Sequence, residues 1–329
     1  MTIGSIASLA GQRLVVTGGA GVIARELLEQ LSAAGADVLS IDRLPLPAEA
    51  PPRVEHLQAD LADADLGPIA RFAPRHILHL AATFERSVES PEFWDQNWTD
   101  NVVVTHRLAE LAGQMGGVES FVFASSYLVY DQAQYSTQEP PTASVALSEI
   151  SRLGSRNLCG AAKLYGEAEL RFARDVQGAS FRTVFARIFR VYGRGSRDVV
   201  SRWVRAALDG EPIEVYHAEN RFDYIYSGDV AEGLLRLAAS PGASGVINLG
   251  SGSSRPVAAV IEAVERATGT RLSATDREAD EPFEASGADT TRLHDVLGWT
   301  PPTVLEAGVE RLVAFERARH GEGAVAVER

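Results

Sequence analysis

Apolar runs alternate with amphipathic segments through the first half of the chain. Residues 25–34 and 101–112 carry apolar positions at helical spacing. Continuous apolar runs, which are typical of strands buried on both faces, occupy 13–17, 37–41, 77–80 and 121–124. The pattern therefore predicts an α/β fold, with a Rossmann-like doubly wound parallel sheet and a smaller C-terminal α/β lobe.

The same alternation predicts how the chain divides. The Rossmann domain is expected over residues 11–186, and residues 223–250 are expected to return to it. Residues 187–222 and 251–317 are expected to build the smaller lobe, and 318–329 to form a disordered tail. The cleft between the lobes should lie at the carboxyl ends of the strands.

Composition narrows the function classes. The formal net charge of −13 over 329 residues argues against a nucleic-acid partner, because no basic stripe is available to neutralise phosphates. One cysteine excludes an intramolecular disulfide, and no apolar run approaches the roughly 20 residues of a membrane helix. Residues 1–11 do not have the pattern of a signal peptide, so we expect a cytoplasmic protein. The seven histidines are scattered, and no metal site is expected.

A glycine-rich turn follows the first apolar run. Gly18-Gly19-Ala20-Gly21-Val22-Ile23-Ala24 lies between a predicted strand and a predicted helix, where glycines let the backbone approach a pyrophosphate. The second strand ends in Asp42, whose carboxylate can bind both hydroxyls of an adenosine ribose. These features predict a dinucleotide site that favours NAD, although Arg43 leaves room for the 2′-phosphate of NADP.

The only lysine of the chain, Lys163, lies four residues after its only cysteine, Cys159. On a helix these two side chains share a face. An ammonium is a compact donor whose pKa shifts readily, unlike that of a guanidinium, so the pair indicates a chemical site. The alternative is that the preference for arginine reflects genomic composition.

Ordered motifs from about Gln12 to Phe315 give the chain a family resemblance. They are Thr17-Gly18-x-x-Gly21-x-Ile23, Asp60-Leu61, His79-Leu80-Ala81-Ala82, Asn101-Val102, Ser125-Ser126-x-x-Val129-Tyr130, the Lys163 helix, Arg187 to Gly193, Asp223 to Ala231, Val246 to Gly252 and Leu297-Gly298-Trp299-x-Pro301. The chain thus resembles the extended short-chain dehydrogenase/reductases, in particular their nucleotide-sugar epimerases, dehydratases and reductases.

This resemblance implies NAD as cofactor and a nucleotide sugar as substrate. The implied cofactor-binding residues are Gly18, Gly21, Val22, Ile23, Asp42, Arg43, Asp60, Leu61, Leu80, Ala81, Ala82, Asn101, Ser125 and Lys163. It also implies a homodimer, formed through the helices over 101–112 and 159–174.

In such enzymes a serine or threonine, a tyrosine and a lysine act together. The corresponding residues here are Ser126 and Lys163, but the tyrosine position holds Cys159. With Lys163 nearby we expect an accessible thiolate near neutral pH, although a cysteine ends several ångströms short of a tyrosine hydroxyl. Three arrangements would overcome the shorter reach of the cysteine: the substrate lies deeper in the cleft, a water molecule bridges the gap, or another group takes the proton. Tyr127 is one candidate for such a group. Alternatively, Cys159 is an unreactive residue that fills the vacated space.

Tyr130 and Tyr192 are two further candidates for the proton by their motifs, whereas Tyr165 should point away from Lys163. The two positions after Ser126 hold Tyr127 and Leu128. Because dehydratases of this group need a carboxylate there, a 4-epimerase or ketoreductase fits better. The alternative is a catalytically inactive NAD-binding protein with a structural or regulatory role.

The resemblance implies Arg190, Arg221 and Arg277 as substrate-binding residues. Arg190 replaces a usual asparagine, and Arg221 lies one residue early, with Phe222 in the expected place. Glu85 and Arg86 are either substrate contacts or solvated loop charges. The stretch 132–144 is longer than usual, which is typical of either an active-site lid or a disordered excursion.

Overall fold

The computed structural model describes residues 5–46, 51–84, 89–277 and 281–327. Its centre is a sheet of seven strands in the order β12-β8-β5-β4-β1-β2-β3, and all of its neighbouring strands are parallel. This is the strand order of a dinucleotide-binding sheet, with the order reversing between β1 and β4. The strands are β1 (Arg13–Thr17), β2 (Asp37–Asp42), β3 (Val54–Gln58), β4 (His76–His79), β5 (Ser120–Ser126), β8 (Arg182–Ile188) and β12 (Gly245–Leu249). The predicted doubly wound α/β fold is confirmed.

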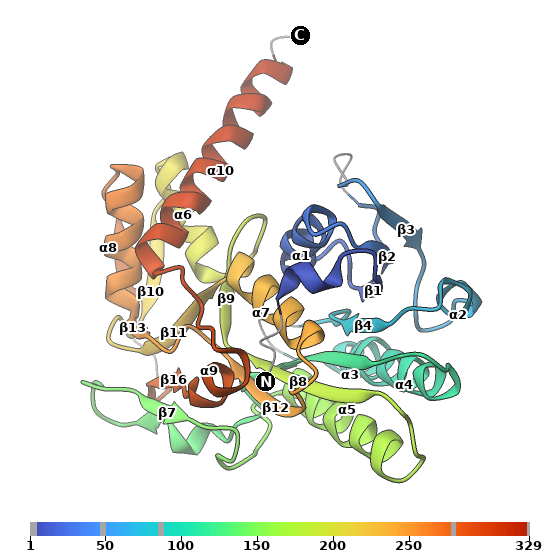
Figure 1. Ribbon diagram of the computed structural model, residues 1–329. Helices are drawn as coiled ribbons and strands as arrows, with labels where there is room; N and C mark the ends of the chain where they lie inside the picture. Colours follow the sequence, from blue (N-terminus) through green and yellow to red (C-terminus); the bar gives the residue numbers. More distant parts are fainter. Residues whose placement is uncertain (1–4, 47–50, 85–88, 278–280, 328–329) are drawn as a thin grey trace.

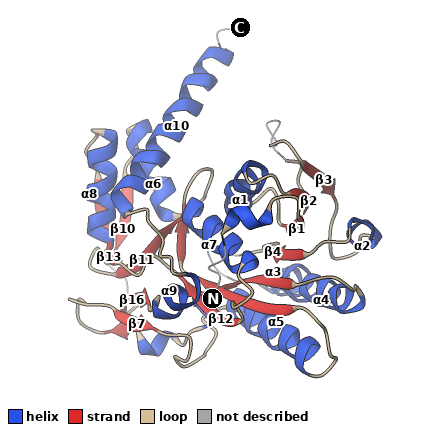
Figure 2. Ribbon diagram, in the orientation of Figure 1, coloured by secondary structure: helices blue, strands red, loops and turns tan. Residues whose placement is uncertain are grey.

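Helices cover both faces of this sheet (Figures 1 and 2). On one face α1 (Val22–Ala33) packs against α7 (Ser227–Ala239). On the other face α4 (Val104–Gln114) packs against α5 (Leu158–Asp175). The short α2 (Gly67–Phe72) connects β3 to β4. Because both faces are covered, the central strands are fully buried and read as continuous apolar runs.

The helix predicted over 101–112 begins earlier than expected. It opens as α3 (Pro91–Asn97), passes through a π-helical turn (Trp98–Val103) and continues as α4. Ser90 caps it, since its Oγ accepts a hydrogen bond from the Phe93 N–H at 3.3 Å. The π-helical turn carries Asp100 and Asn101, and such turns often occur at functional sites.

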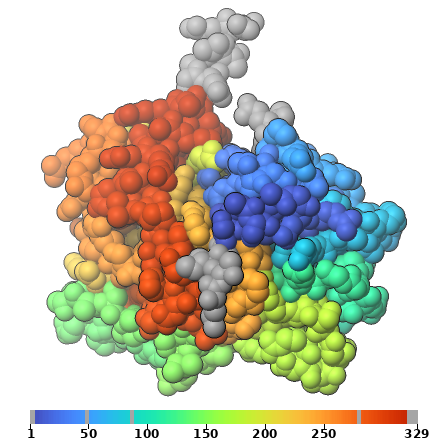
Figure 3. All heavy atoms as spheres, in the orientation of Figure 1, coloured from blue at the N-terminus to red at the C-terminus, as the bar shows by residue number. Residues whose placement is uncertain are grey.

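The C-terminal lobe has its own apolar core between α6 (Val199–Asp209), α8 (Val257–Thr268) and α10 (Leu305–Val327). The two-stranded sheet of β10 (Ile213–Tyr216) and β14 (Ala274–Arg277) belongs to this lobe. In the space-filling view the C-terminal residues, orange to red, gather on the left and the N-terminal residues, blue, on the right (Figure 3). A disordered tail was predicted over 318–329, whereas α10 continues as a helix to Val327.

Three smaller sheets join the lobe to the core. The first pairs β9 (Arg190–Tyr192), β11 (Arg221–Tyr226) and β13 (Ser254–Pro256). In the others β6 (Ser136–Thr137) pairs with β15 (Phe283–Glu284), and β7 (Val145–Leu147) pairs with β16 (Ser286–Ala288). The stretch 132–144 is therefore folded against the C-terminal lobe and is not a disordered excursion. The short α9 (Thr291–Leu297) follows β16. In the described part of the chain, no helix is both long and apolar enough to cross a membrane.

Candidate active site

The glycine turn lies at the carboxyl end of β1, beside the end of β4. Gly18 has a φ of +75°, and a side chain built there would place its Cβ 2.7 Å from the Ala81 backbone nitrogen. Only glycine allows this approach. Gly21 is the N-cap of α1 and offers no side chain to its first turn, so the N–H groups there are available to an anion.

Asp42 and Arg43 lie at the end of β2. The Asp42 carboxylate accepts hydrogen bonds from the backbone N–H groups of Ala20, at 3.0 Å, and Leu44, at 2.9 Å, which fix it beside the glycine turn. An Nη2 of Arg43 lies 2.7 Å from Asp100 and 3.9 Å from Asp60, and the hydrogen bond to Asp100 raises the pKa of the guanidinium. Because carboxylates surround Arg43, this corner disfavours the extra phosphate of NADP.

A cavity of about 480 Å³ opens between these strand ends. Nine of the expected cofactor residues line it: Gly18, Gly21, Asp42, Arg43, Asp60, Leu61, Leu80, Ala81 and Ala82. Its other lining residues include Thr83, Asp100 and Arg197, none of which the sequence analysis had singled out. Val22 and Ile23 lie in the first turn of α1. The Asn101 side chain donates to the Thr83 carbonyl, at 2.9 Å, and accepts from the Thr83 N–H, at 2.8 Å, which holds the cavity wall in place.

A buried hydrogen-bond chain supports the floor of the cavity. His79 Nδ1 lies 2.7 Å from the Thr17 hydroxyl, and its Nε2 lies 3.0 Å from the Thr105 hydroxyl. Thr105 Oγ1 donates to the Asn101 carbonyl, so it accepts from His79 Nε2–H. Burial, and then the positive charge of Lys163, lower the pKa of His79 to about 3. The motif His79-Leu80-Ala81-Ala82 contains this neutral histidine but gave no sign of its role, which is to tie β1, β4 and α4 together.

Cys159 and Lys163 lie on the first turns of α5, as predicted, and both are buried. Asn157 caps this helix by accepting from the Gly160 N–H at 2.8 Å. The Lys163 ammonium lies 4.8 Å from the centroid of the Phe123 ring, and it has no hydrogen-bond partner among the described residues. Burial lowers the pKa of Lys163. An ammonium on a buried side chain, without a hydrogen bond to the described residues, fits the ribose hydroxyls of a dinucleotide.

The thiol differs from expectation. Burial raises the pKa of Cys159, and the opposing effect of Lys163 only partly offsets this. The thiolate that the sequence analysis expected near neutral pH is therefore disfavoured in this structure. The Leu158 N–H donates to a Glu89 carboxylate oxygen at 2.8 Å, and the charge of Glu89 raises the thiol pKa further. Glu89 lies far from Cys159 in sequence, and no motif pointed to it.

The serine loop packs directly against the start of α5. A Cβ on Gly160 would lie 2.6 Å from the Leu128 carbonyl oxygen, so glycine permits the contact. Ser126 ends β5, and its Oγ accepts from the Leu128 N–H at 3.2 Å. Tyr127 is buried and stacks on Phe189, with 5.4 Å between the ring centroids. Ser126, Tyr127 and Cys159 are thus brought together.

The other candidate tyrosines are occupied elsewhere. The Tyr130 hydroxyl donates to Asn248 at 2.6 Å, and burial raises its pKa to about 12. The Tyr192 hydroxyl donates to the Leu305 carbonyl at 3.3 Å, and burial raises its pKa as well. Tyr165 is half exposed. Neither Tyr130 nor Tyr192 is suited to take a substrate proton.

Behind the serine loop, Ser125 belongs to a buried ionic network. Its hydroxyl donates to Glu167 at 2.6 Å, and the Arg187 guanidinium donates to both oxygens of Glu167, at 3.0 and 2.9 Å. Both charged side chains are almost fully buried. This network fixes β5 and β8 against α5, and it accounts for the Arg187 of the sequence motifs.

The three expected substrate arginines occupy different surroundings. Arg190 starts β9, and its Cζ lies 3.5 Å from the centroid of the Phe222 ring. Arg221 starts β11, and its Nε is buried with no hydrogen-bond partner among the described residues. Arg277 is exposed on β14 and pairs with Glu214 at 2.5 Å. The candidates Glu85 and Arg86 lie outside the described residues.

Comparisons with known proteins identify the family of the chain. The model of the NAD dependent epimerase/dehydratase family matches residues 14–250. A UDP-glucose 4-epimerase of Mycolicibacterium smegmatis is 31% identical, over 93% of this chain and 98% of the relative. UDP-glucuronic acid decarboxylase 4 of Arabidopsis thaliana is 27% identical, over 93% of this chain and 69% of the relative.

Among solved structures, MoeE5 in complex with UDP-glucose and NAD is similar, with a TM-score of 0.80 and 29% identity over 94% of this chain and 99% of that one. MoeE5 has also been solved with UDP-glucuronic acid and NAD, and that structure gives a TM-score of 0.81. The family model covers well over half of the chain, including the glycine turn, Ser126 and the α5 pair. The chain therefore belongs to the NAD dependent epimerase/dehydratase family, as an enzyme whose cofactor is NAD.

Proposed function

We propose that this enzyme moves a hydride reversibly between NAD and a carbon of a nucleotide-linked sugar, as a 4-epimerase or ketoreductase does. One observation carries the proposal: a buried, unpaired Lys163 ammonium and the Cys159 thiol lie on one face of α5, next to the Ser126 loop. No carboxylate occupies the two positions after Ser126, which disfavours dehydration. The similarity to a UDP-glucose 4-epimerase and to MoeE5 supports the substrate class.

In this proposal each residue has a separate task. Bound NAD would supply a hydride acceptor and, in the reverse step, a hydride donor. The Lys163 ammonium would donate to the ribose hydroxyls of bound NAD, and Asp42 would accept from the hydroxyls of its adenosine ribose. Ser126 holds the substrate hydroxyl, and Tyr127 forms the adjoining wall of the sugar site.

The proton of the substrate hydroxyl needs an acceptor, and a Cys159 thiol with a raised pKa can accept it only if the thiol gives up its own proton at the same time. As the sugar C–H bond breaks, the hydroxyl proton passes to Cys159 Sγ and the thiol proton passes to the Glu89 carboxylate. The sugar carbon becomes a ketone, and the thiol is regenerated without forming a free thiolate. The support is the hydrogen bond that holds Glu89 at Leu158, beside Cys159. The reverse transfer to the opposite face of the ketone completes an epimerisation.

The test is turnover on a panel of nucleotide sugars, followed by absorbance near 340 nm and by product analysis. We expect transient reduction or an altered sugar from the wild type, and a large loss of kcat in Cys159→Ala and Glu89→Gln with unchanged NAD content. A Cys159→Ala variant with full activity would make the thiol a packing residue. Tight NAD binding with no conversion would instead favour a structural or regulatory NAD-binding protein.

The substrate diphosphate needs cations at the entrance of the cleft. Arg221 is the proposed donor, because its buried Nε has no hydrogen-bond partner in the described structure. Planar guanidinium groups suit phosphate oxygens. Arg277 would join Arg221 only by leaving its ion pair with Glu214.

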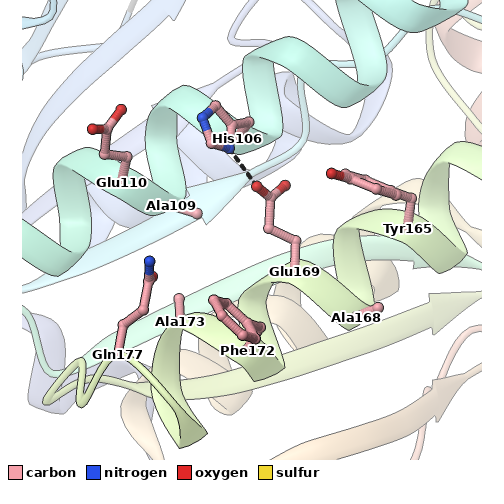
Figure 4. A pocket seen from close by; sticks show the side chains of 9 residues that line it. All are labelled: His106, Ala109, Glu110, Tyr165, Ala168, Glu169, Phe172, Ala173 and Gln177. Carbon is pink, nitrogen blue, oxygen red and sulfur yellow. Dashed lines mark hydrogen bonds and ion pairs between the residues drawn. The ribbon is translucent and has the colours of Figure 1, made fainter.

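We also propose a homodimer through α4 and α5. Large side chains are exposed on α5 and on the adjoining α3 and π-helical turn, with Phe172 52%, Trp94 63% and Trp98 57% exposed. A cavity of about 590 Å³ lies between the two helices, and Figure 4 shows Tyr165 and Phe172 beside it, with His106 bonded to Glu169 across it. Exposed apolar surface of this kind is typical of an interface.

The mass of the particle in solution tests the dimer. Phe172→Glu is expected to convert a dimer into a monomer in light-scattering measurements, whereas a wild-type monomer at micromolar concentration would contradict the proposal.

We place the enzyme in the cytoplasm, where a single free thiol stays reduced.

A further inference from the structure

Two partly buried arginines share one carboxylate next to the serine loop. Arg156, just before α5, donates to both carboxylate oxygens of Glu284, with an Nη1–Oε2 distance of 2.6 Å. Arg190 lies beside them, with its Nη2 3.8 Å from Glu284 Oε2. The Glu284 side chain is only 9% exposed. The cluster of Arg156, Arg190 and Glu284 therefore carries one positive charge in excess, in a chain whose net charge is −13.

Unsatisfied polar atoms gather around this cluster. Six side-chain polar atoms of the described residues have essentially no exposed surface of their own and lack a hydrogen-bond partner, and four of them are Tyr135 OH, Ser136 Oγ, Arg190 Nε and Arg221 Nε. Ser136 pairs with Glu284 across β6 and β15, and Arg221 forms a bridge with Ala285. Buried polar groups are normally paired, so a concentration of unpaired ones indicates a missing ligand.

The cluster borders the reacting centre. The Arg156 N–H donates to the Leu128 carbonyl at 3.1 Å, in the loop that begins at Ser126. The Arg190 Cζ lies 5.8 Å from the centroid of the Tyr127 ring. None of the three cluster residues lines the cofactor cavity. An anion bound here would therefore lie at the sugar ring and not at the dinucleotide.

The geometry of Arg190 favours a planar anion. Its Cζ lies 3.5 Å from the centroid of the Phe222 ring, so the ring covers one side of the guanidinium, and its N–H groups form no hydrogen bond with the described residues. A guanidinium of this kind binds a carboxylate through two parallel hydrogen bonds. Glu284 does not provide them, since Arg156 already holds both of its oxygens.

We propose that the cluster of Arg156, Arg190 and Glu284 is a subsite for a carboxylate on the sugar, so that the substrate is a nucleotide-linked uronic acid. The inference rests on the proposed function and names the substrate class of that site. Arg190 binds the carboxylate, and Arg156 holds Glu284 away from it. The subsite selects the uronic acid over the neutral hexose, because a neutral sugar leaves the charge of the Arg190 guanidinium without a counterion.

Calorimetric titration of the NAD-loaded protein with three ligands tests this: a nucleoside diphosphate, its hexose and its hexuronate. The wild type should bind the hexuronate about 10-fold or more tightly than the hexose, as expected for a charge-assisted pair. In Arg190→Gln this preference should fall to within about 2-fold while hexose affinity stays the same. Arg190→Lys, which keeps the charge without the fork, should give an intermediate preference.

The matched control is Arg75→Gln, which removes the guanidinium of the exposed Arg75–Glu119 ion pair. This variant should keep the preference for the hexuronate over the hexose. NAD content and thermal midpoint confirm that each variant is folded. Equal wild-type affinity for hexose and hexuronate overturns the inference alone. An equal loss for the bare diphosphate in Arg190→Gln also overturns it, because Arg190 would then bind phosphate. Failure of every nucleotide sugar to bind overturns the proposed function as well.

Discussion

Replacing Lys163 with methionine should stabilise the cofactor-free protein. The Lys163 ammonium is buried and has no hydrogen bond among the described residues. A cation on a side chain that is only 6% exposed and that lacks a hydrogen-bond partner costs about 1–3 kcal/mol, and its contact with the Phe123 ring returns about 0.5–2 kcal/mol. Methionine has a similar length and fills the space without this cost. We therefore expect the free energy of unfolding at pH 7 to rise by about 1 kcal/mol.

The stability difference between the wild type and Lys163→Met should depend on pH, and the direction follows from the pKa of Lys163. Burial lowers the folded-state pKa of Lys163 from its ordinary 10.5, so above the lowered value the unfolded state binds more protons. The wild type therefore gains stability between that value and 10.5, while the Lys163→Met variant has no such gain. The difference in stability between the two proteins should shrink as the pH rises through this window.

Urea unfolding of NAD-free protein, followed by the fluorescence of its tryptophans, measures both effects. Arg75→Met is the control, since loss of an exposed ion pair should change the stability by less than about 0.5 kcal/mol. In the presence of NAD the order should reverse, because the wild type binds the cofactor more tightly and gains stability from it. A Lys163→Met variant that is less stable without NAD at pH 7, or a difference that is independent of pH, would refute the reasoning.

Three further changes test the packing and the cofactor site. Gly160→Ala should lower the free energy of unfolding, measured by chemical denaturation, by about 1–3 kcal/mol, because the new Cβ would lie 2.6 Å from the Leu128 carbonyl oxygen. Gly113→Ala is the control: its Cβ would meet nothing within 4 Å, so stability should be unchanged or rise by up to about 1 kcal/mol. Glu167→Gln should cost about 3–5 kcal/mol in the same assay, since it leaves the buried Arg187 guanidinium uncompensated. Asp42→Ala should weaken NAD binding about 10-fold while NADP binding changes less, and equal losses in fluorescence titrations would contradict this role.

Local features of the fold could be predicted from the sequence. The strand, glycine turn and helix around Gly18 are contiguous, and Asp42 ends the next strand, so short-range patterns located both. The shared face of Cys159 and Lys163 follows from helix geometry alone. The earlier helix start at Pro91 also had a local signal, because Ser90-Pro91 is a capping serine followed by a proline at the first helical position.

Long-range contacts could not be predicted in this way. The Arg156–Glu284 pair joins residues 128 positions apart, and no pattern around either residue selects the other. Glu284 belongs to a two-residue strand that exists only because β6 lies beside it. The surroundings of Arg190 were equally hidden, since its stacking on Phe222 brings together strands from separate motifs. The character of the substrate site therefore depends on tertiary structure.

The protonation state of the thiol shows the same limit, and it decides the chemistry. From sequence, a lysine four residues away suggests a thiolate, but burial of the helix face has opposite effects on the two groups: it raises the pKa of Cys159 and lowers that of Lys163. The site therefore favours a neutral thiol, which can accept a proton only while it passes its own proton on. A tyrosine in this place would reach the substrate alone, whereas the thiol needs a second acceptor. Glu89, held at Leu158 by a hydrogen bond that spans 69 residues, is the carboxylate that we assign to this role.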